Sequence, residues 1–564
     1  MKRALLILLI NIIICQDYYE ELMNGTVTEE YCGNAIGNIT EIINEGYIYS
    51  DYLKAPTQRN SSYFTKVDLI KELNNINKIN RSFYEFYGDI IEIIGKTGDG
   101  HFSFRFSADS NIFPLNLYYF CIPFKFYVYE EYDEDNNTIN DTYLTIQEEE
   151  SGICHGEDSE EIISKSGKRI ISINDLEPFD YLEKMDKYID SSHSRQRKYI
   201  NSLLSIQNGG LDVIYYPLKK QNLSISIKFE GEDELLETEF KLQKRGSSSE
   251  EFKEFYLKEQ KKFFKNRIPF PKFNEIENKF KIQKGLINKL KEDEEAEKDI
   301  WDLKDSEGRI KCRVDEENKF NVLLQKSFNS EKNFSDYENI MYECFSKFYS
   351  NDYKIIIIEA QNGGGYSELC YPFTKYVYPK NSKPLFSSMK STQLNLRNFF
   401  INDENVNPET CFPYTEKDDI LNGSEDIYDD GENHVIHKRS KYIEDLNIFE
   451  KKIMEKKRKE YLATGKTKNS TDILIFTDGF SFSCTSFFIK NLQVSGAGII
   501  VGYQARPDID KFDFDASQSN SGLESFDISE NVQNLKKLGF ESQITFREEF
   551  IQMIKKIQEY LWNF

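Results

Sequence analysis

Three short runs of consecutive apolar residues limit the possible folds more than any other feature of this chain. They lie at 353–359 (YKIIIIE), 472–476 (DILIF) and 497–502 (AGIIVG). A strand with one face in water alternates apolar and polar residues, whereas a continuous apolar run is typical of a strand covered on both faces. Layered α/β proteins provide such cover, and a helical stretch at 487–493 lies between the second and third runs. The sequence therefore predicts an α/β core in the C-terminal half.

The rest of the chain indicates further domains, since 564 residues exceed what one hydrophobic core usually organises. Apolar residues recur every three or four positions from Tyr31 to about Phe106, as in helices, and strand-like segments follow. The Lys- and Glu-rich stretch after Gly246 is typical of a solvated helical linker. We expect five regions: 1–16 signal peptide, 17–110 N-terminal helical region, 111–245 β-rich region, 246–310 charged helical linker and 311–564 core, with a polar surface insert at 403–465.

The N-terminus has the pattern of a secretory signal peptide. Lys2 and Arg3 precede an apolar run from Ala4 to Cys15, which is too short to span a bilayer comfortably, and polar residues return at Gln16. We therefore expect 1–16 to be removed, leaving no membrane anchor. The mature protein would be secreted or extracellular, or would reside in the lumen of the secretory or endolysosomal pathway. Glycosylation sequons agree with export. They begin at Asn24, Asn38, Asn60, Asn80, Asn136, Asn140, Asn222, Asn333, Asn422 and Asn469.

Cysteine content and charge narrow the function further. Of the 9 cysteines, Cys15 would leave with the signal peptide, and several of the others could pair in a secreted chain, although their spacing does not give the connectivity. The formal net charge of −23 would repel phosphate backbones, so we expect no nucleic-acid partner. The sequence has no zinc-finger spacing and no phosphate-binding Gly-rich loop, and the chemistry inferred below requires no cofactor or metal.

A cluster of small hydroxyl residues is the first candidate site. The segment 477–486 reads TDGFSFSCTS and joins the apolar strand at 472–476 to the helical stretch. Small residues at such a turn let a side chain project from the sheet edge, and amides at the helix start can bind a developing oxyanion. The alternative interpretation is a Ser-rich helix N-cap. The Gly-x-Ser-x-Gly turn of the α/β hydrolases is excluded, because no glycine follows Ser481 or Ser483 at the required position.

Two further motifs could join this cluster. Three glycines, 363–365, follow the first apolar strand, and glycine permits positive φ and close approach of a substrate, although a plain tight turn explains this motif alone. His101 lies between Gly100 and the alternating aromatic strand 102–106, where a lone histidine is otherwise more often structural. The remaining histidines lie in polar, loop-like segments and are weaker candidates for a general base. They are His155, His193, His434 and His437.

Together these motifs resemble the superfamily of tail-specific (C-terminal processing) proteases and tricorn-core serine peptidases. In that superfamily a strand leads to Asp-x-Arg-x-Asn-x-Gly-Gly, and this chain reads EAQNGGG from Glu359, matching at Asn362 and at the last two glycines. The nucleophile segment there usually reads Ser-Ala-Ser-Ala-Ser-Glu, and its middle, attacking serine aligns with Ser483. The Val-Val-Gly strand that follows matches 500–502. The resemblance is firmest over 353–507 and around His101, and it implies a crotonase-like, stacked β-β-α core.

The resemblance is closest to the His-Ser-Glu branch, which includes tricorn and the chlamydial secreted protease. The turn at 99–101 (DGH) resembles that branch's Asp-x-His, although tricorn has a serine where this chain has Gly100, and the pair at 483–484 resembles its Ser-Cys. The bacterial Ser-Lys branch fits less well, because its lysine position holds Asp508. Lys511 lies three residues later, and Lys490 lies on the preceding helix.

That branch also has a glutamate that orients the histidine, about sixty residues beyond the serine. Glu541, Glu548 and Glu549 lie 58, 65 and 66 residues beyond Ser483, so the spacing does not choose among them. We take Glu548 as the orienting residue, with Glu541 or Glu549 as alternatives.

The resemblance implies a secreted serine endopeptidase that cleaves polypeptides through an acyl-enzyme on Ser483. His101 would take the serine proton, and the amides of Gly364 or Gly365 and of Cys484 would bind the oxyanion. The alternative is an inactive relative that binds peptides or apolar ligands, like the superfamily's interphotoreceptor retinoid-binding modules. The 43 Phe and 35 Tyr residues are compatible with that function. The stretch 167–175 also resembles the middle of a PDZ-type peptide-binding module.

Overall fold

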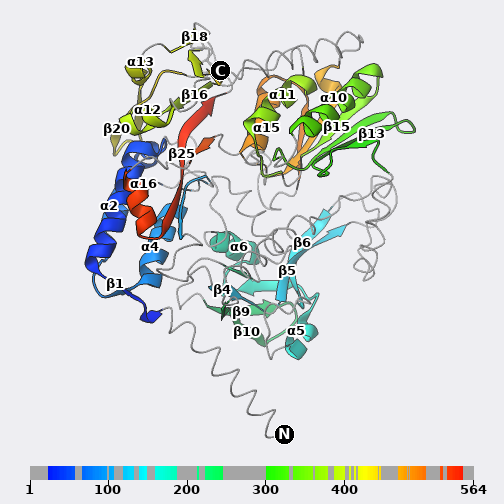
Figure 1. Ribbon diagram of the computed structural model, residues 1–564. Helices are drawn as coiled ribbons and strands as arrows, with labels where there is room; N and C mark the ends of the chain where they lie inside the picture. The colour runs from blue at the N-terminus through cyan, green and yellow to red at the C-terminus, as the bar shows by residue number, and fades with distance from the viewer. Residues whose placement is uncertain are drawn as a thin grey trace. The chain divides into compact units, whose positions relative to one another are not determined.

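The chain forms two compact units, each assembled from three stretches of sequence (Figure 1). The first consists of 1–44, 61–281 and 525–543, and the second of 45–60, 282–524 and 544–564. The computed structural model describes residues 23–56, 66–97, 99, 101–106, 118–122, 124–132, 139–148, 159–186, 213–214, 223–244, 300–329, 334–359, 362–378, 386–399, 405–407, 412–414, 417–442, 444–445, 468–478, 481, 483–503, 521–524 and 530–550.

Helices dominate the start of the first unit, as the spacing of apolar residues predicts. Helix α4 begins with a capping box, in which Ser82 Oγ accepts a hydrogen bond from the Glu85 amide and the Glu85 carboxylate accepts one from the Ser82 amide. The unit's helices are α2 (Glu29–Gly46, whose last two residues belong to the second unit), α3 (Leu69–Asn74), α4 (Phe83–Gly95), α5 (Ser159–Lys165), α6 (Pro178–Asp186) and α16 (Glu530–Lys537).

The strands of the first unit form small antiparallel sheets with the orders β1-β2, β10-β9-β7, β11-β4-β8 and β5-β6, and β3 pairs with the first residues of β25 (Phe540–Phe550). The stretch 167–175 contains β7 and a turn at Asn174-Asp175, and α6 follows it. The strands are β1 (Thr26–Val27), β2 (Arg81–Ser82), β3 (Ser103–Phe106), β4 (Tyr118–Cys121), β5 (Phe124–Tyr132), β6 (Ile139–Glu148), β7 (Ile170–Ile173), β8 (Val213–Ile214), β9 (Ser224–Phe229), β10 (Leu235–Glu239) and β11 (Lys241–Lys244).

The second unit contains the predicted α/β core. Its helices are α10 (Phe334–Ser350), α11 (Ser367–Val377), α12 (Gln393–Phe399), α13 (Lys417–Leu421) and α15 (Cys484–Val494), with the short 3-10 turns η1 (Tyr52–Lys54) and η6 (Ser470–Asp472). Its strands are β12 (Leu303–Lys304), β13 (Ile310–Asp315), β14 (Phe320–Gln325), β15 (Lys354–Ile358), β16 (Phe386–Met389), β17 (Asn405–Asn407), β18 (Phe412–Pro413), β19 (Glu425–Asp429), β20 (His434–Lys438), β21 (Glu444–Asp445), β22 (Ile473–Asp478), β23 (Ile499–Tyr503), β24 (Ser521–Glu524) and the end of β25.

The three apolar runs of the sequence are neighbouring strands of one sheet, with the order β12-β13-β14-β15-β22-β23. From β14 to β23 the strands are parallel, and Ile358 at the end of β15 pairs with Phe476 in β22. The prediction of an α/β core is thus confirmed.

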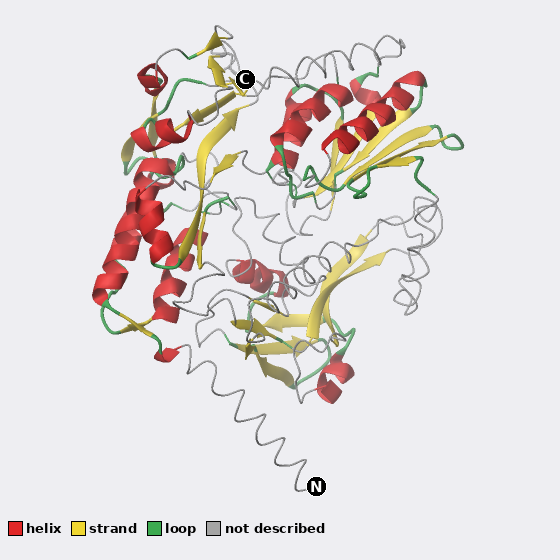
Figure 2. Cartoon of the chain, viewed as in Figure 1, coloured by secondary structure: helices red, strands yellow, loops and turns green. Residues whose placement is uncertain are grey.

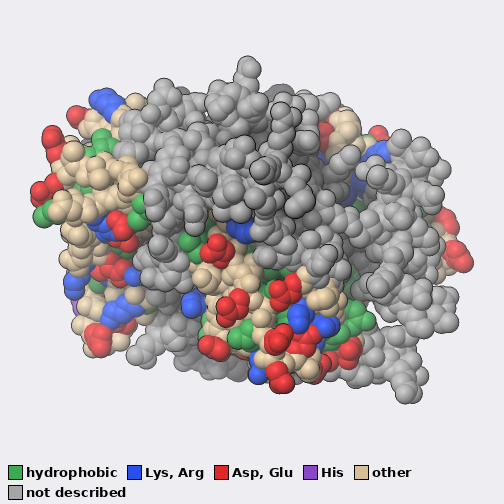
Figure 3. Space-filling view, turned by 90° about the horizontal axis from the view of Figure 1, so that it is seen from below, with side chains coloured by type: hydrophobic (Ala, Val, Ile, Leu, Met, Phe, Trp, Pro, Cys, Tyr) green, Lys and Arg blue, Asp and Glu red, His purple; other side chains and the backbone are tan. Residues whose placement is uncertain are grey.

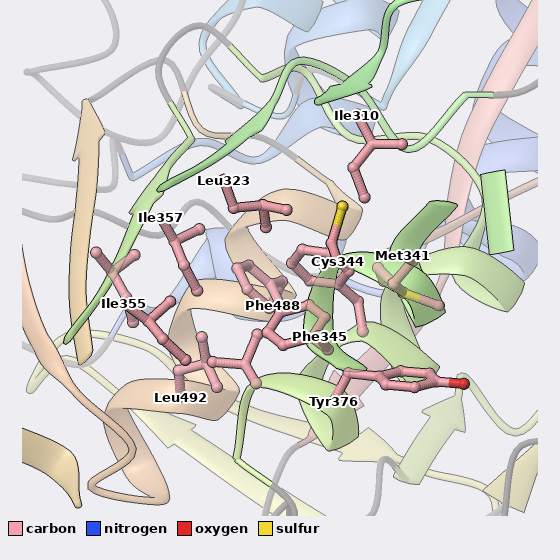
Figure 4. Close-up of a cluster of buried hydrophobic side chains, with 14 of the residues drawn as sticks. Ile310, Leu323, Met341, Cys344, Phe345, Ile355, Ile357, Tyr376, Phe488 and Leu492 are labelled. Carbon is pink, nitrogen blue, oxygen red and sulfur yellow. The ribbon is translucent and has the colours of Figure 1, made fainter. Parts of the chain in front are cut away.

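The sheet is buried on both faces, which explains why its strands do not alternate. Figure 2 shows α10, α11 and α15 on one face, and Figure 4 shows Leu323, Ile355 and Ile357 directed at Phe345 and Phe488 of those helices. The intervening residues of the strands, Val322, Leu324, Ile356 and Ile358, are buried on the opposite face. Each fully buried Ile or Leu side chain contributes about 1.5–3 kcal/mol to folding.

The polar insert expected at 403–465 folds more than a surface excursion would, and this expectation needs correction. Its described residues carry β17 to β21 and α13, and Ile420 and His437 are fully buried. His437 Nδ1 lies 3.0 Å from Asp51 Oδ2, which also pairs with Lys390 Nζ at 3.1 Å. Burial alone would raise the pKa of Asp51, but the hydrogen bond from His437 and the charge of Lys390 outweigh it and hold that pKa well below its usual range.

Two other expected segments are described only in part or not at all. The signal peptide at 1–16 lies outside the described residues, as does the charged linker up to 299. The described end of that linker, 300–310, contains β12 and the first residue of β13 and no helix. Among the described residues, no helix combines the length and apolarity needed to cross a bilayer. Acidic side chains are interspersed with basic ones on the described part of the face in Figure 3.

Candidate active site

The serine turn and the glycine segment leave the same edge of the parallel sheet. Strands β15 and β22 are neighbours, and the Glu359 amide donates to the Phe476 carbonyl at 2.8 Å where both strands end. The helices that follow, α11 and α15, pack together, with the rings of Phe373 and Phe488 4.8 Å apart. The carboxyl ends of parallel strands are where α/β proteins usually place ligands. The two motifs, more than a hundred residues apart in sequence, therefore form one candidate site.

Ser483 has an unusual backbone conformation at the start of α15. Its φ of 54° and ψ of −125° lie in a region that L-residues rarely adopt. Such a conformation costs about 1–3 kcal/mol and is found preferentially at functional sites. Ser483 occupies the N-cap position, but within the described helix start its side chain makes no capping hydrogen bond. The N-cap interpretation of this serine therefore lacks the interaction that defines a cap.

The hydroxyl groups of the two neighbouring serines form hydrogen bonds within the turn. Ser481 is buried, and its Oγ lies 2.5 Å from Thr477 Oγ1. Ser486 is also buried, and its Oγ donates to the Ser483 carbonyl at 2.8 Å. Ser483 is half-buried and so keeps access to solvent. Of these three serines, Ser483 is best placed to meet a substrate.

The buried side chain of Asn362 fixes the glycine segment by hydrogen bonds. Asn362 Nδ2 donates to Glu359 Oε2 at 2.7 Å, and Asn362 Oδ1 accepts from the Gly364 amide at 3.0 Å. Both Asn362 and Glu359 are fully buried. Because Asn362 Oδ1 accepts its hydrogen bond, the Gly364 amide is already engaged within the protein.

A buried tyrosine, Tyr337, lies near Glu359. Burial, with the Glu359 and Asp305 carboxylates nearby, raises the pKa of Tyr337 well above its usual value, so this phenol stays neutral.

Gly365 occupies a position that only glycine can fill. Its φ is +143°, and a Cβ there would lie 2.2 Å from the backbone carbonyl carbon of Phe328. The Phe328 amide donates to the Gly364 carbonyl, and the Tyr366 amide donates to the Phe328 carbonyl, both at 2.9 Å. The chain after β14 thus fixes Gly365 from one side. Of the two predicted oxyanion donors in this loop, Gly365 is the one whose amide is not paired to Asn362.

A disulfide joins the two halves of the site. Cys484, which directly follows Ser483, is bonded to Cys370 in the first turn of α11, with Cα atoms 6.1 Å apart. A second disulfide, Cys312–Cys344, connects β13 to α10, and Cys121 is also disulfide-bonded. The expectation that several cysteines pair is confirmed, while Cys32 is free and buried in α2.

His101 lies in the first unit, in the turn between α4 and β3 that the sequence predicts. Asp99, fully buried, organises the turn: its Oδ1 accepts from the His101 amide and its carbonyl from the Phe102 amide, both at 3.0 Å. The Asp99 amide in turn donates to Thr97 Oγ1 at 3.2 Å. His101 is only 6% exposed. Its backbone is thus fixed by hydrogen bonds within its own turn.

The three candidate glutamates all lie on β25. Glu541 is exposed and pairs with Arg105 of β3, four residues beyond His101, or about 13 Å along an extended strand. That register places it away from the histidine turn. Glu548 and Glu549 lie further along the strand, opposite Ser388 and Ser387 of β16. Their side chains lie outside the described residues.

The other base candidates are less well placed or fall outside the described residues. Lys490 is exposed on α15, six residues or about 9 Å beyond Cys484 along the helix. Lys511, His155 and His193 lie outside the described residues. His434 is exposed at the start of β20, beside Asp429. Sequence reasoning missed two supports of the glycine segment, Gln325 and Phe328. The Gln325 carbonyl accepts from Asn362 Nδ2 at 3.4 Å, and the Phe328 carbonyl accepts from the Tyr366 amide. No local pattern links these residues to the glycine motif.

No family model matches the chain, and no curated protein matches it. Solved structures do match. Mature CPAF gives a TM-score of 0.46 at 12% identity, over 93% of this chain and 90% of that one. The photosystem II D1 C-terminal processing protease gives 0.29 at 8% identity, over 93% and 89%. A putative S41 protease from Bacteroides fragilis gives 0.29 at 9% identity, over 91% and 85%.

Proposed function

We propose that this chain is a secreted serine endopeptidase that forms its acyl-enzyme on Ser483. The observation that carries the proposal is the backbone of Ser483, which is strained, half-buried and located at the start of α15 beside the glycine segment. A serine used only as a cap or for packing has no need of that conformation. Strain of this kind is found preferentially at functional sites, and amides at a helix start can bind a developing oxyanion.

In the proposed reaction, Ser483 Oγ attacks the carbonyl carbon of a peptide bond in a polypeptide substrate. His101 accepts the serine proton and passes it to the leaving amine as the C–N bond breaks. Water then hydrolyses the resulting ester, again with His101 as base. Glu548 orients His101, with Glu541 or Glu549 as alternatives, of which the β25 register disfavours Glu541.

The oxyanion of the tetrahedral intermediate would be bound by the amides of Gly365 and Cys484. The Gly364 amide is the weaker candidate, because Asn362 already accepts its hydrogen bond. Each such donor typically contributes about 3 kcal/mol to transition-state stabilisation. We also propose a crotonase-like arrangement for the core and a PDZ-like role in peptide binding for the β7–α6 segment, in which Asn174 Oδ1 accepts from the Ser226 amide at 2.7 Å.

The peptidase function predicts covalent labelling of one residue. The mature protein should react with a fluorophosphonate probe, and peptide mapping by mass spectrometry should place the phosphonyl group on Ser483. Ser481→Ala should still label, because that hydroxyl is buried against Thr477. If wild type neither labels nor hydrolyses protein but binds an apolar ligand whether or not Ser483 is changed, the binding-protein alternative replaces this proposal.

Export predicts a processed and glycosylated chain. Protein collected from the medium of a eukaryotic host should begin at about residue 16 or 17 by N-terminal sequencing, and its mass should fall on treatment with an N-glycosidase. Sequon asparagines Asn24, Asn80, Asn422 and Asn469 are exposed, so they are accessible to the modifying enzyme. Recovery of the chain from the cytosol with Met1 intact would contradict export.

A further inference from the structure

We propose that the disulfide Cys370–Cys484 positions the catalytic serine, so that hydrolysis requires this bond and is lost when a dithiol reduces it. The inference rests on the function proposed above. Its starting point is location: Cys484 is the residue after the nucleophile, and Cys370 lies five residues after Gly365. The bond therefore links the two segments that supply the oxyanion amides, and one of its cysteines, Cys484, is itself a proposed donor.

The disulfide would help to maintain the strained backbone conformation of Ser483. A non-glycine residue at φ 54° keeps that conformation only where its surroundings enforce it. On the helix side, Ser483 accepts hydrogen bonds at its carbonyl from the Ser486 hydroxyl and the Phe487 amide. At the next residue, the disulfide anchors the chain to α11, where Cys484 Sγ also lies 3.3 Å from the Tyr366 carbonyl oxygen. Without the bond, the first turn of α15 can relax toward an ordinary N-cap.

Of the two fully described disulfides, Cys370–Cys484 is the less deeply buried. Cys484 is 7% exposed, whereas Cys370, Cys312 and Cys344 are each 0% exposed. A dithiol thiolate would attack Cys484 Sγ, releasing the Cys370 thiolate, and its second thiol would then close on the mixed disulfide. The protein gains two electrons and two protons as two thiols, and the dithiol becomes a cyclic disulfide. Reoxidation by an oxidised thiol compound reverses the exchange.

The second disulfide provides a matched control. Cys312–Cys344 lies in the same unit and the same hydrophobic core. It joins β13 to α10, and neither of its cysteines belongs to the glycine segment or the serine turn. Both disulfides should stabilise the fold, since each constrains the unfolded chain, the first over a separation of 114 residues and the second over 32. Only loss of the Cys370–Cys484 disulfide should lower kcat.

The test compares wild type, Cys370→Ser/Cys484→Ser and Cys312→Ser/Cys344→Ser on fluorescein-labelled casein, with and without dithiothreitol, well below their thermal midpoints. Reduction should lower the kcat of wild type by about 100-fold, the usual effect of a misplacement near 1 Å, with little change in KM. Activity should return on reoxidation. The 370/484 variant should have the low kcat in both conditions, and the 312/344 variant should keep near-wild-type kcat and its sensitivity to dithiothreitol.

The decisive readout is kcat in molecules whose redox state is known. Mass spectrometry after alkylation identifies the reduced cysteines, and circular dichroism shows that the reduced protein remains folded. If the 370/484 variant does not fold, reduced wild type gives the same decision. Wild-type kcat in folded protein with Cys370 and Cys484 alkylated would overturn the inference and leave the peptidase proposal intact. Wild type that is oxidised, folded and without hydrolysis or fluorophosphonate labelling would overturn both.

Discussion

Ser483→Ala and His101→Ala should each lower kcat/KM for casein cleavage by about 10⁴- to 10⁶-fold, and the double variant should lose little more. A nucleophile and its base act as one unit, so removing either removes nearly the whole covalent pathway. The thermal midpoint of Ser483→Ala should stay near that of wild type, because the change removes one half-buried hydroxyl without a described capping bond. His101→Ala should cost more stability, since His101 is buried.

Two further variants decide between this mechanism and its alternatives. Ser481→Ala should retain activity within about tenfold and lose only stability, because it deletes a buried hydrogen bond to Thr477. Lys490→Ala should be close to wild type in both respects, since this lysine is exposed. Loss of activity in Ser481→Ala but not in Ser483→Ala would show that the motif alignment is displaced by two residues and that Ser481 is the nucleophile. Loss in Lys490→Ala but not in His101→Ala would indicate a Ser-Lys pair.

The elements around Ser483 could be predicted from the sequence because local composition determines them. The runs of Ile and Leu in β15, β22 and β23 suit a strand covered on both faces, and the structure confirms each to within two residues at either end. Glycines follow β15, and a segment with glycine and serines follows β22, and such residues disfavour continuation of a strand, so the strand ends could also be predicted. Since parallel neighbours end at one edge, the pairing of β15 with β22 brings the two motifs together.

Features that depend on distant partners could not be predicted in this way. His437 lies in a polar, loop-like stretch, yet it is buried and contacts Asp51. Because Asp51 lies 386 residues earlier in the chain, the local sequence gives no sign of this contact. The pairing of Cys370 with Cys484 spans 114 residues, and no spacing rule favours it over other pairings. Likewise, the sequence does not separate Gly364 from Gly365 as oxyanion donors. The distinction arises from the Asn362 side chain and from the backbone of Phe328.

Gly365→Ala should lower kcat by at least 10²- to 10³-fold, the usual effect of losing one oxyanion donor. An added Cβ would lie 2.2 Å from the Phe328 carbonyl carbon and 2.4 Å from the Phe328 oxygen, and neither backbone atom can rotate away. The loop must therefore move, which displaces the Gly365 amide from the oxyanion. The positive φ adds strain, so the thermal midpoint should also fall. Fluorophosphonate labelling should slow in parallel with kcat, because the probe requires the same donors.

Gly496→Ala separates backbone strain from displacement of the donor. Gly496 follows the other end of α15 at φ +61°, and a Cβ there meets no atom within 4 Å. This variant should lose about 1–2 kcal/mol of stability from the left-handed conformation alone and keep its kcat. Comparing labelling rates per folded molecule removes the contribution of unfolding from both variants. A Gly365→Ala protein that is folded and retains kcat within threefold of wild type would exclude the Gly365 amide, and the oxyanion would then have to be assigned to Cys484 and to a donor outside the glycine segment.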